Sequence, residues 1–115
     1  MTLPVGLDKV TLTGKYQDVH GDPLSGTVTI EGPTWIVDTV NNIVFTYCET
    51  QTLDLNGSFS VDLVATDATG VVPNPFTYSV VERINGMRTH RYTISLPKIN
   101  PTADISDLIN IADFL

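Results

Sequence analysis

The segment VTLTGKYQDVHGDPLSGTVTI, Val10–Ile30, carries the clearest structural signal in the chain. In VTLTGK and again in TVTI, apolar or small residues alternate with polar ones. A period of two, with Thr and Val enriched, is typical of half-buried β-strands. Gly21, Pro23 and Gly26 stand between the two runs and favour a turn, since Gly accepts positive φ and Pro presets φ. The segment therefore predicts two strands joined by a turn.

The same period continues along the chain. Alternating runs recur at residues 57–65 (GSFSVDLVA), 76–84 (FTYSVVERI) and 89–97 (THRYTISLP). Asn-Gly pairs at 56–57 and 85–86 predict turns, and we expect a tight type I′ hairpin turn at the second pair. About seven short strands with regular turn signals predict an all-β fold, a single antiparallel β-sandwich over residues 1–98.

Strand alternation also selects the side chains that face the core. We expect these to be Leu12, Val28, Ile30, Phe59, Val61, Leu63, Tyr78, Val80, Ile94 and Leu96.

The region from residue 33 to 52 has a weaker pattern. We expect a strand or loop around Trp35–Val40, a turn at Asn41-Asn42 and a strand from Ile43 onward. Asp67–Pro75, with two prolines, is expected to be a loop. Cys48 is expected to be buried or half-buried, since free cysteine usually is.

Composition restricts the possible functions. The chain has 115 residues, a size for one domain, and a net charge of −7 from 13 acids and 6 bases. Such a charge disfavours nucleic acid as a partner. No apolar run reaches the ~20 residues that span a bilayer, and the first ten residues do not resemble a secretory signal. We therefore expect no membrane partner and synthesis in a cytoplasm.

Asp18, His20 and Asp22 alternate within the first turn and raise the possibility of a metal site. A calcium loop needs more carboxylates, and a zinc site needs more His or Cys ligands. A turn without metal is the favoured interpretation. No hydrolase or phosphate-binding motif is present, so we predict no catalytic, cofactor-binding or metal-binding residues and no enzymatic activity.

Residues 99–115 differ from the rest and form an acidic, apolar tail. The tail is predicted to be helical or extended and to dock on a partner, because monomers rarely expose so many apolar side chains. The alternative is that it folds back onto its own domain. Its candidate contact residues are Ile105, Leu108, Ile109, Ile111, Phe114 and Leu115.

The predicted hairpin around Asn85-Gly86 carries Glu82, Arg83, Arg88 and Arg91. One interpretation is a set of cross-strand charge pairs on the solvated face, with His90 among them. The other is a subunit contact, because arginine pairs with carboxylates through two hydrogen bonds.

Trp35 is the only tryptophan. It is expected in the core. The alternative is an exposed Trp35 that, with Tyr47 or Tyr16, stacks a sugar ring or anchors a partner.

Two resemblances bear on fold and function. The first strand ending in Gly14, the DVHGDPLSG turn and the later DLNGSF strand (Asp54, Gly57, Phe59) resemble carboxypeptidase-regulatory-like and transthyretin-like domains. This resemblance implies a transthyretin-like or immunoglobulin-like β-sandwich. It implies nothing about activity.

The hairpin YSVVERINGMR and the ending ADISDLI are similar to small virion proteins of tailed phages of actinobacteria. In this motif the matching residues are Tyr78, Val80, Glu82, Arg83, Gly86 and Arg88. The resemblance implies a structural virion protein, with head decoration preferred and a tail- or fibre-associated receptor- or glycan-binding module as the alternative. The implied partners are the major capsid protein or neighbouring virion subunits, a further copy of the chain, or a cell-surface glycan. A bacterial surface adhesion domain is a third, less favoured interpretation.

Overall fold

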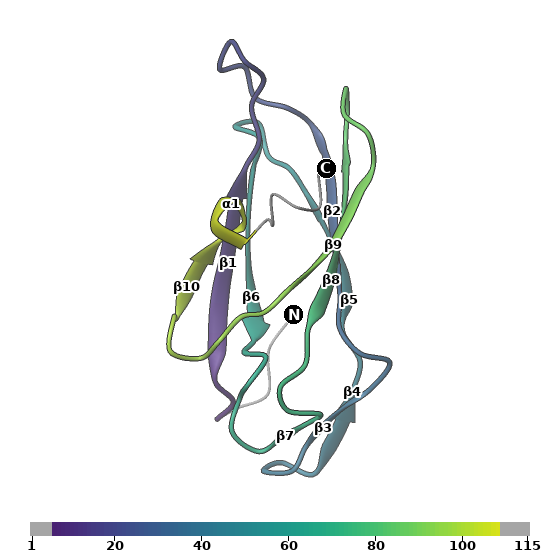
Figure 1. Cartoon of the computed structure of the whole chain (residues 1–115), viewed down its shortest axis with the longest axis vertical. Coiled ribbons are helices and arrows are strands. Elements are labelled where there is room, and N and C mark those ends of the chain that lie inside the picture. The colour runs from purple at the N-terminus through teal and green to yellow at the C-terminus, as the bar shows by residue number, and fades with distance from the viewer. Residues whose placement is uncertain (1–5, 109–115) are drawn as a thin grey trace.

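The computed structural model describes residues 6–108, and these residues form β-strands joined by turns, with one short helix (Figure 1). The elements are β1 (Lys9–Lys15), β2 (Gly26–Glu31), β3 (Ile36–Asp38), β4 (Ile43–Phe45), β5 (Cys48–Thr52), β6 (Ser58–Val64), β7 (Val71–Val72), β8 (Tyr78–Ile84), β9 (His90–Ile94), β10 (Thr102–Asp104) and α1 (Ile105–Leu108). The predicted all-β class is confirmed. No helix among the described residues has the length and apolar character needed to cross a membrane.

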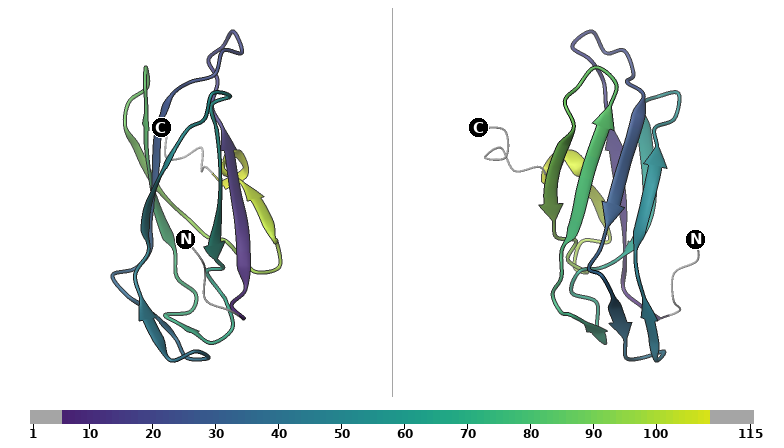
Figure 2. Two further views of the ribbon diagram at one scale, coloured as in Figure 1. Left: turned by 180° about the vertical axis from the view of Figure 1, so that it is seen from behind. Right: turned by 90° about the vertical axis from the view of Figure 1, so that its right-hand side faces the viewer.

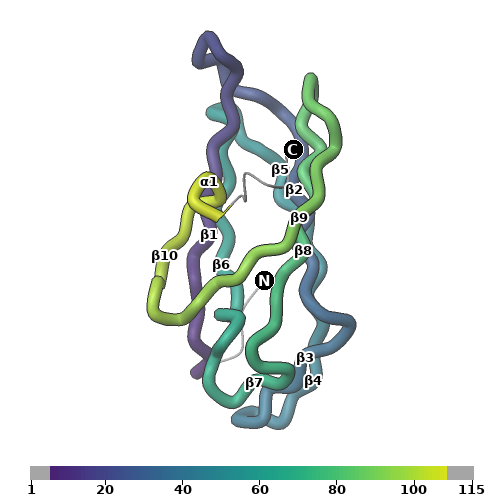
Figure 3. Tube along the Cα trace, viewed as in Figure 1, coloured from purple at the N-terminus to yellow at the C-terminus, as the bar shows by residue number. Residues whose placement is uncertain are grey.

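The strands form three sheets, with the orders β10-β1-β6, β5-β2-β8-β9 and β4-β3-β7. Neighbouring strands are antiparallel with one exception, because β10 runs parallel to β1. All strand pairs within residues 9–94 are antiparallel, as predicted, and the parallel pair involves a strand of the segment that we predict to be a helical or extended tail. Figure 3 shows β10 beside β1, although the two strands lie near opposite ends of the chain.

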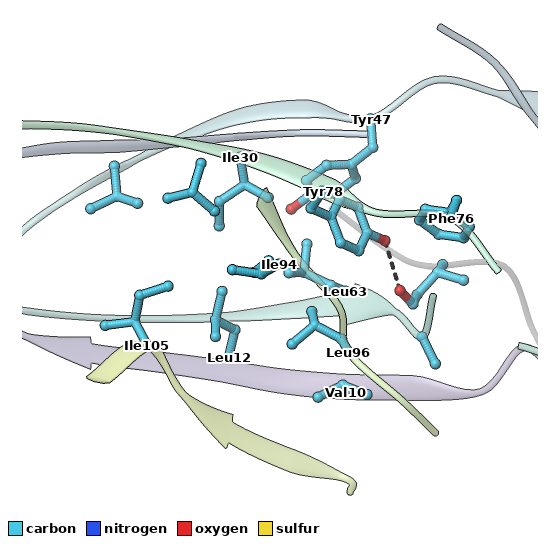
Figure 4. Close-up of a cluster of buried hydrophobic side chains, with 14 of the residues drawn as sticks. Val10, Leu12, Ile30, Tyr47, Leu63, Phe76, Tyr78, Ile94, Leu96 and Ile105 are labelled. Atoms are coloured by element: carbon cyan, nitrogen blue, oxygen red, sulfur yellow. Dashed lines mark hydrogen bonds between the residues drawn. The ribbon is translucent and has the colours of Figure 1, made fainter. Parts of the chain in front are cut away.

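The core lies between the first two sheets, which face each other (Figure 4). Of the ten side chains predicted to face inward, nine are buried and Val61 is partly buried against the others. Tyr78 is fully buried and donates its hydroxyl hydrogen bond to the Val64 carbonyl at 2.7 Å. This bond satisfies the one polar atom that Tyr78 brings into the core.

Hydrogen bonds from a side chain hold one turn, and a backbone hydrogen bond closes another. In the 18–26 turn the Asp18 carboxylate accepts hydrogen bonds from the backbone N–H groups of His20 and Asp22, at 2.8 and 3.0 Å. The predicted turn is therefore present in this segment. At residues 84–87 the Met87 N–H donates to the Ile84 carbonyl at 3.0 Å.

The turn type predicted at Asn85-Gly86 is wrong. In this described turn only Gly86 has a positive φ, of 87°, whereas a type I′ turn requires positive φ at both central residues. Asn85 is instead held from outside the hairpin, since its backbone N–H donates to the Ser25 carbonyl at 2.9 Å.

The third sheet forms one end of the molecule, opposite the 18–26 and 85–89 turns (Figure 2). We expect a strand or loop, then a turn, then a strand across residues 35–45, and the structure has strand, turn and strand, with Asn42 at φ 55° in the turn. The prediction of a loop over 67–75 is wrong in part, because Val71–Val72 pairs with β3 as β7. The backbone pairing overrides the adjacent prolines.

Two predicted core residues are exposed. Cys48 begins β5 at a sheet edge, paired with exposed Glu31, and faces outward. Trp35 precedes β3 and exposes 52% of its surface. Both predictions rest on residue type alone. Around Trp35 and Cys48 the sequence has no clear alternation that would show which side chains face the core.

Candidate functional site

The three predicted arginines are all exposed. Arg83 lies on β8, Arg91 on β9, and Arg88 in the loop between these strands. No arginine forms an ion pair with a carboxylate among residues 6–108. All three side chains are exposed on the β8–β9 hairpin.

Glu82, which we expected to pair with these arginines, points the other way. It lies between Val80 and Ile84 in β8, and all three side chains are buried. Glu82 retains only 3% of its exposure. The prediction of a solvated Glu–Arg face is wrong, because alternate residues of a strand face opposite sides of the sheet.

The buried Glu82 carboxylate is held from both facing sheets. Tyr16, which follows β1, donates its hydroxyl hydrogen bond to Glu82 Oε2. His90, opposite Glu82 on β9, places Nδ1 3.2 Å from Oε1. The Tyr92 ring lies 4.9 Å from the His90 ring, measured between centroids. We call Tyr16, Glu82, His90 and Tyr92 the inter-sheet cluster.

Burial and the Glu82 charge act together on the two tyrosines. Burial raises the pKa of the Tyr16 hydroxyl, and the hydrogen bond to Glu82 and the charge of that carboxylate raise the pKa further. Burial, followed by the charge of Glu82, raises the pKa of Tyr92 in the same direction. Both hydroxyls stay protonated at neutral pH, so Tyr16 remains a donor to the carboxylate.

The inter-sheet cluster links the two sheets, because Tyr16, which follows β1 of the first sheet, bonds Glu82 of the second. Glu82 is buried and already accepts bonds, so no substrate group can reach its oxygens without opening the cluster. Hydrogen bonds to a charged group contribute about 1.5–3 kcal/mol each, so the cluster stabilises this end of the molecule. The sequence does contain a signal for this cluster, namely the alternation of the strands. Glu82 occupies the same alternate positions as the inward-facing Tyr78 and Val80, and His90 the same alternate positions as Tyr92 and Ile94.

Other carboxylates also have structural roles. Several accept hydrogen bonds from backbone N–H groups at turns or loop contacts, and these are Asp8, Asp18, Asp38, Asp54, Asp67 and Asp104. Among residues 6–108 no group of three His, Cys, Asp or Glu side chains is arranged to hold a metal ion. At these six positions the acidic residues, which outnumber the basic ones in this chain, therefore stabilise turns and loops.

The predicted docking tail divides into two parts. Thr102–Asp104 is β10 of the first sheet, and Ile105 is 2% exposed within the core. Ile105 packs beside Gly14 and Phe59, where a Cβ added to Gly14 would lie 2.9 Å from Ile105 Cγ2 and 2.4 Å from Phe59 Cε1. Ile105 thus contacts its own domain. Leu108 is partly buried against the same core, and Ile109, Ile111, Phe114 and Leu115 lie outside the described residues.

The end formed by β3, β4 and β7 exposes apolar side chains that the sequence analysis does not place on the surface. Large apolar residues with more than two fifths of their surface exposed gather there, namely Trp35, Val40, Ile43, Val44 and Val72. We call this set the apolar end. The second aromatic residue proposed for sugar stacking is not exposed beside Trp35, since Tyr47 is buried and Tyr16 belongs to the inter-sheet cluster.

Comparison with known proteins does not narrow the choice of function. No protein-family model matches the sequence, and no curated protein matches it significantly.

Proposed function

We propose that the chain is a β-sandwich of transthyretin-like or immunoglobulin-like type that serves as a structural protein of a tailed bacteriophage. In this proposal it is made in the host cytoplasm and becomes part of the virion, where it decorates the outer surface of the head. The support is the resemblance of the YSVVERINGMR hairpin to virion proteins, together with two facing sheets built around one core. The carboxylates bound to backbone groups favour a structural role over a catalytic one.

The observation that carries the proposal is the outward arginine group on the β8–β9 hairpin. Arg83, Arg88 and Arg91 are three of only six basic residues in a chain with net charge −7. All three are exposed and none pairs with a described carboxylate. An unpaired basic group on an acidic protein attracts an acidic surface and orients the encounter.

The partner best suited to this surface is a carboxylate-rich face of the major capsid protein or of a neighbouring virion subunit. Guanidinium groups bind carboxylates through paired hydrogen bonds, which fixes orientation as well as affinity. The two facing sheets supply a rigid support, because Arg83 and Arg91 project from strands whose opposite faces are buried.

The test is binding to phage particles that lack the protein. Arg83→Ala with Arg91→Ala should weaken binding at least ~10-fold and reduce its salt dependence, because charge-assisted contacts are lost. Lys9→Ala with Lys15→Ala removes the same charge from β1 and should change binding little. Equal effects of the two pairs, or location of the protein away from separated heads by mass spectrometry, would contradict the proposal.

A second candidate is a tail- or fibre-associated module that binds a receptor or glycan. One observation favours it, the half-exposed Trp35 at the apolar end, since a tryptophan face stacks on sugar rings. Titration of host cell-wall polysaccharide against the Trp35 fluorescence tests it. Saturable quenching, together with loss of polysaccharide binding by isothermal titration calorimetry in Trp35→Ala, would support the module, and an unchanged spectrum would exclude sugar contact at Trp35.

A further inference from the structure

The open sheet edges are protected unevenly. Natural proteins block exposed edges with charged residues or proline, because unpaired strands recruit other strands. Among the six edge strands that residues 6–108 form, five carry such a block on the strand or beside it: Asp62 on β6, Glu49 on β5, Arg91 on β9, Asp104 on β10 and Pro73 after β7. The sixth is β4, Ile43–Phe45, which has neither.

Pairing within the third sheet aligns three valines. Val37 lies opposite Val44 on one side and opposite Val72 on the other. Directly paired residues share one face of a sheet, so Val44, Val37 and Val72 form a continuous row. Val44 and Val72 are 67% and 49% exposed, which places the row on the outer face.

The apolar end also lacks exposed charge. Residues 33–46 and 70–77 contain one charged side chain, Asp38. Asp38 is fully buried and accepts hydrogen bonds from the Val40 N–H at 3.0 Å and from Asn41 Nδ2 at 2.7 Å. The strands and turns of this end therefore carry no exposed charge of their own, and Asp8 and Lys98 bond Thr69 beside them.

We propose that β4 pairs with β4 of a second copy of the chain, antiparallel about a two-fold axis at Val44. Self-pairing by two-fold symmetry makes the same surface serve both subunits. Val44 then lies opposite Val44 of the second copy, and Ile43 lies opposite Phe45 of the second copy. The valine row doubles in length, and the two small sheets become one sheet of six strands.

A second copy fits this edge better than an unrelated strand for two reasons. The three-residue strand is self-complementary, because both of its ends are large and apolar and its centre is Val44. Two copies with net charge −7 repel each other over most approaches, and the apolar end is where they meet without exposed charges facing one another. The arginines lie on β8, β9 and the loop between them, so this pairing does not depend on the proposed function.

The test compares the oligomeric state of the full chain with that of matched variants by sedimentation equilibrium. The wild-type chain should be a dimer in equilibrium with monomer. Val44→Lys should raise the dimer dissociation constant at least ~10-fold, because it places like charges directly opposite each other at the axis. Val19→Lys, at a 96% exposed position in the 18–26 turn, adds the same charge and should leave the dimer unchanged.

A charge-pair experiment tests the position of the axis. A mixture of Val44→Lys and Val44→Glu chains should form a mixed dimer, since each lysine then faces a glutamate, whereas each variant alone should be monomeric. Circular dichroism and melting temperature should show both variants folded, because Val44 is largely exposed. A wild-type chain that is monomeric up to ~1 mM would overturn the proposal. A dimer that survives in Val44→Lys, or a mixture that stays monomeric, would do the same.

Discussion

At the end of the molecule near the 85–89 loop, a carboxylate is buried between the sheets, while at the opposite end a tryptophan and several aliphatic residues face solvent. Glu82 is tolerated inside because Tyr16 and His90 contact its oxygens. Trp35 and Val44 remain 52% and 67% exposed, so each forgoes part of the about 1.5–3 kcal/mol that full burial of a large apolar side chain contributes. One end is completed by contacts within the chain, whereas the apolar end leaves a surface that the proposed β4 pairing would cover.

The largest loss of stability is expected from removing the Glu82 carboxylate, the hydrogen-bond acceptor of the inter-sheet cluster. Glu82→Ala leaves the Tyr16 hydroxyl and the His90 ring without their carboxylate and should lower the free energy of unfolding by about 3–5 kcal/mol. Urea unfolding measures this loss. Tyr16→Phe removes one bond and should cost about 1.5–3 kcal/mol. Glu31→Ala, an exposed control on β2, should stay within ~0.5 kcal/mol, and an equally small effect of Glu82→Ala would mean that the cluster does not stabilise the fold.

The next effect tests whether the segment after β10 belongs to the core. Ile105→Ala removes a buried side chain and should cost about 2–5 kcal/mol in urea unfolding. Ile99→Ala, at an 82% exposed position, is the matched control and should cost less than ~0.5 kcal/mol. If Ile105→Ala kept full stability but lost particle binding, Ile105 would act on a partner and the core assignment would fail.

A smaller effect is expected on the stability of the fold in acid, through Asp38 at the apolar end. Burial opposes ionisation of Asp38, yet hydrogen bonds from Asn41 and Val40 outweigh it and hold the pKa below its ordinary value of 3.8. A lowered pKa means that Asp38 stabilises the fold at pH above 3.8 and that this contribution is lost as pH falls through the lower, folded-state pKa. Unfolding curves measured from pH 7 to pH 2, roughly the range of this linkage, should show a weaker decline for Asp38→Asn than for wild type. Parallel declines would show that Asp38 has no part in acid sensitivity.

The smallest effect is spectroscopic. Trp35 is the only tryptophan and lies at the apolar end, so its fluorescence reports on that surface alone. Dimerisation through β4 should shift its emission to shorter wavelength as protein concentration rises, because water is excluded from the ring. The shift should be absent in Val44→Lys. A shift of equal size in that variant would place the association elsewhere.

Much of the fold could be predicted from alternation. The strands around Val28 and Ile94 follow a period of two with one face buried, and β6 does so up to Leu63, after which Val64 is buried as well. The residues of the inter-sheet cluster on β8 and β9 follow the same alternation. Residue type alone assigns the charged Glu82 to the surface, which is why the prediction places it there. A buried carboxylate is detectable when its position is in phase with core residues and a tyrosine or histidine shares that phase.

The apolar end could not be predicted in the same way. Ile36 and Val37 are consecutive and both apolar, so the pattern does not say which of them faces inward. The direction depends on pairing with β4 and β7, and β7 is only two residues long. The parallel partner of β1 was equally hidden, because the three-residue β10 contains no apolar pattern of its own.

That parallel pairing has a consequence for synthesis. Thr13 donates its hydroxyl hydrogen bond to Asp104 at 3.0 Å across 91 residues of sequence, and Thr11 pairs with Thr102. At about 5–20 residues per second, β1 leaves the ribosome roughly 5–20 s before β10 is made. During that interval one edge of β1 lacks its permanent neighbour while β6 can already occupy the other. Until β10 has been made, that edge of β1 is open to pairing with other strands, so the order of synthesis exposes it to association between molecules.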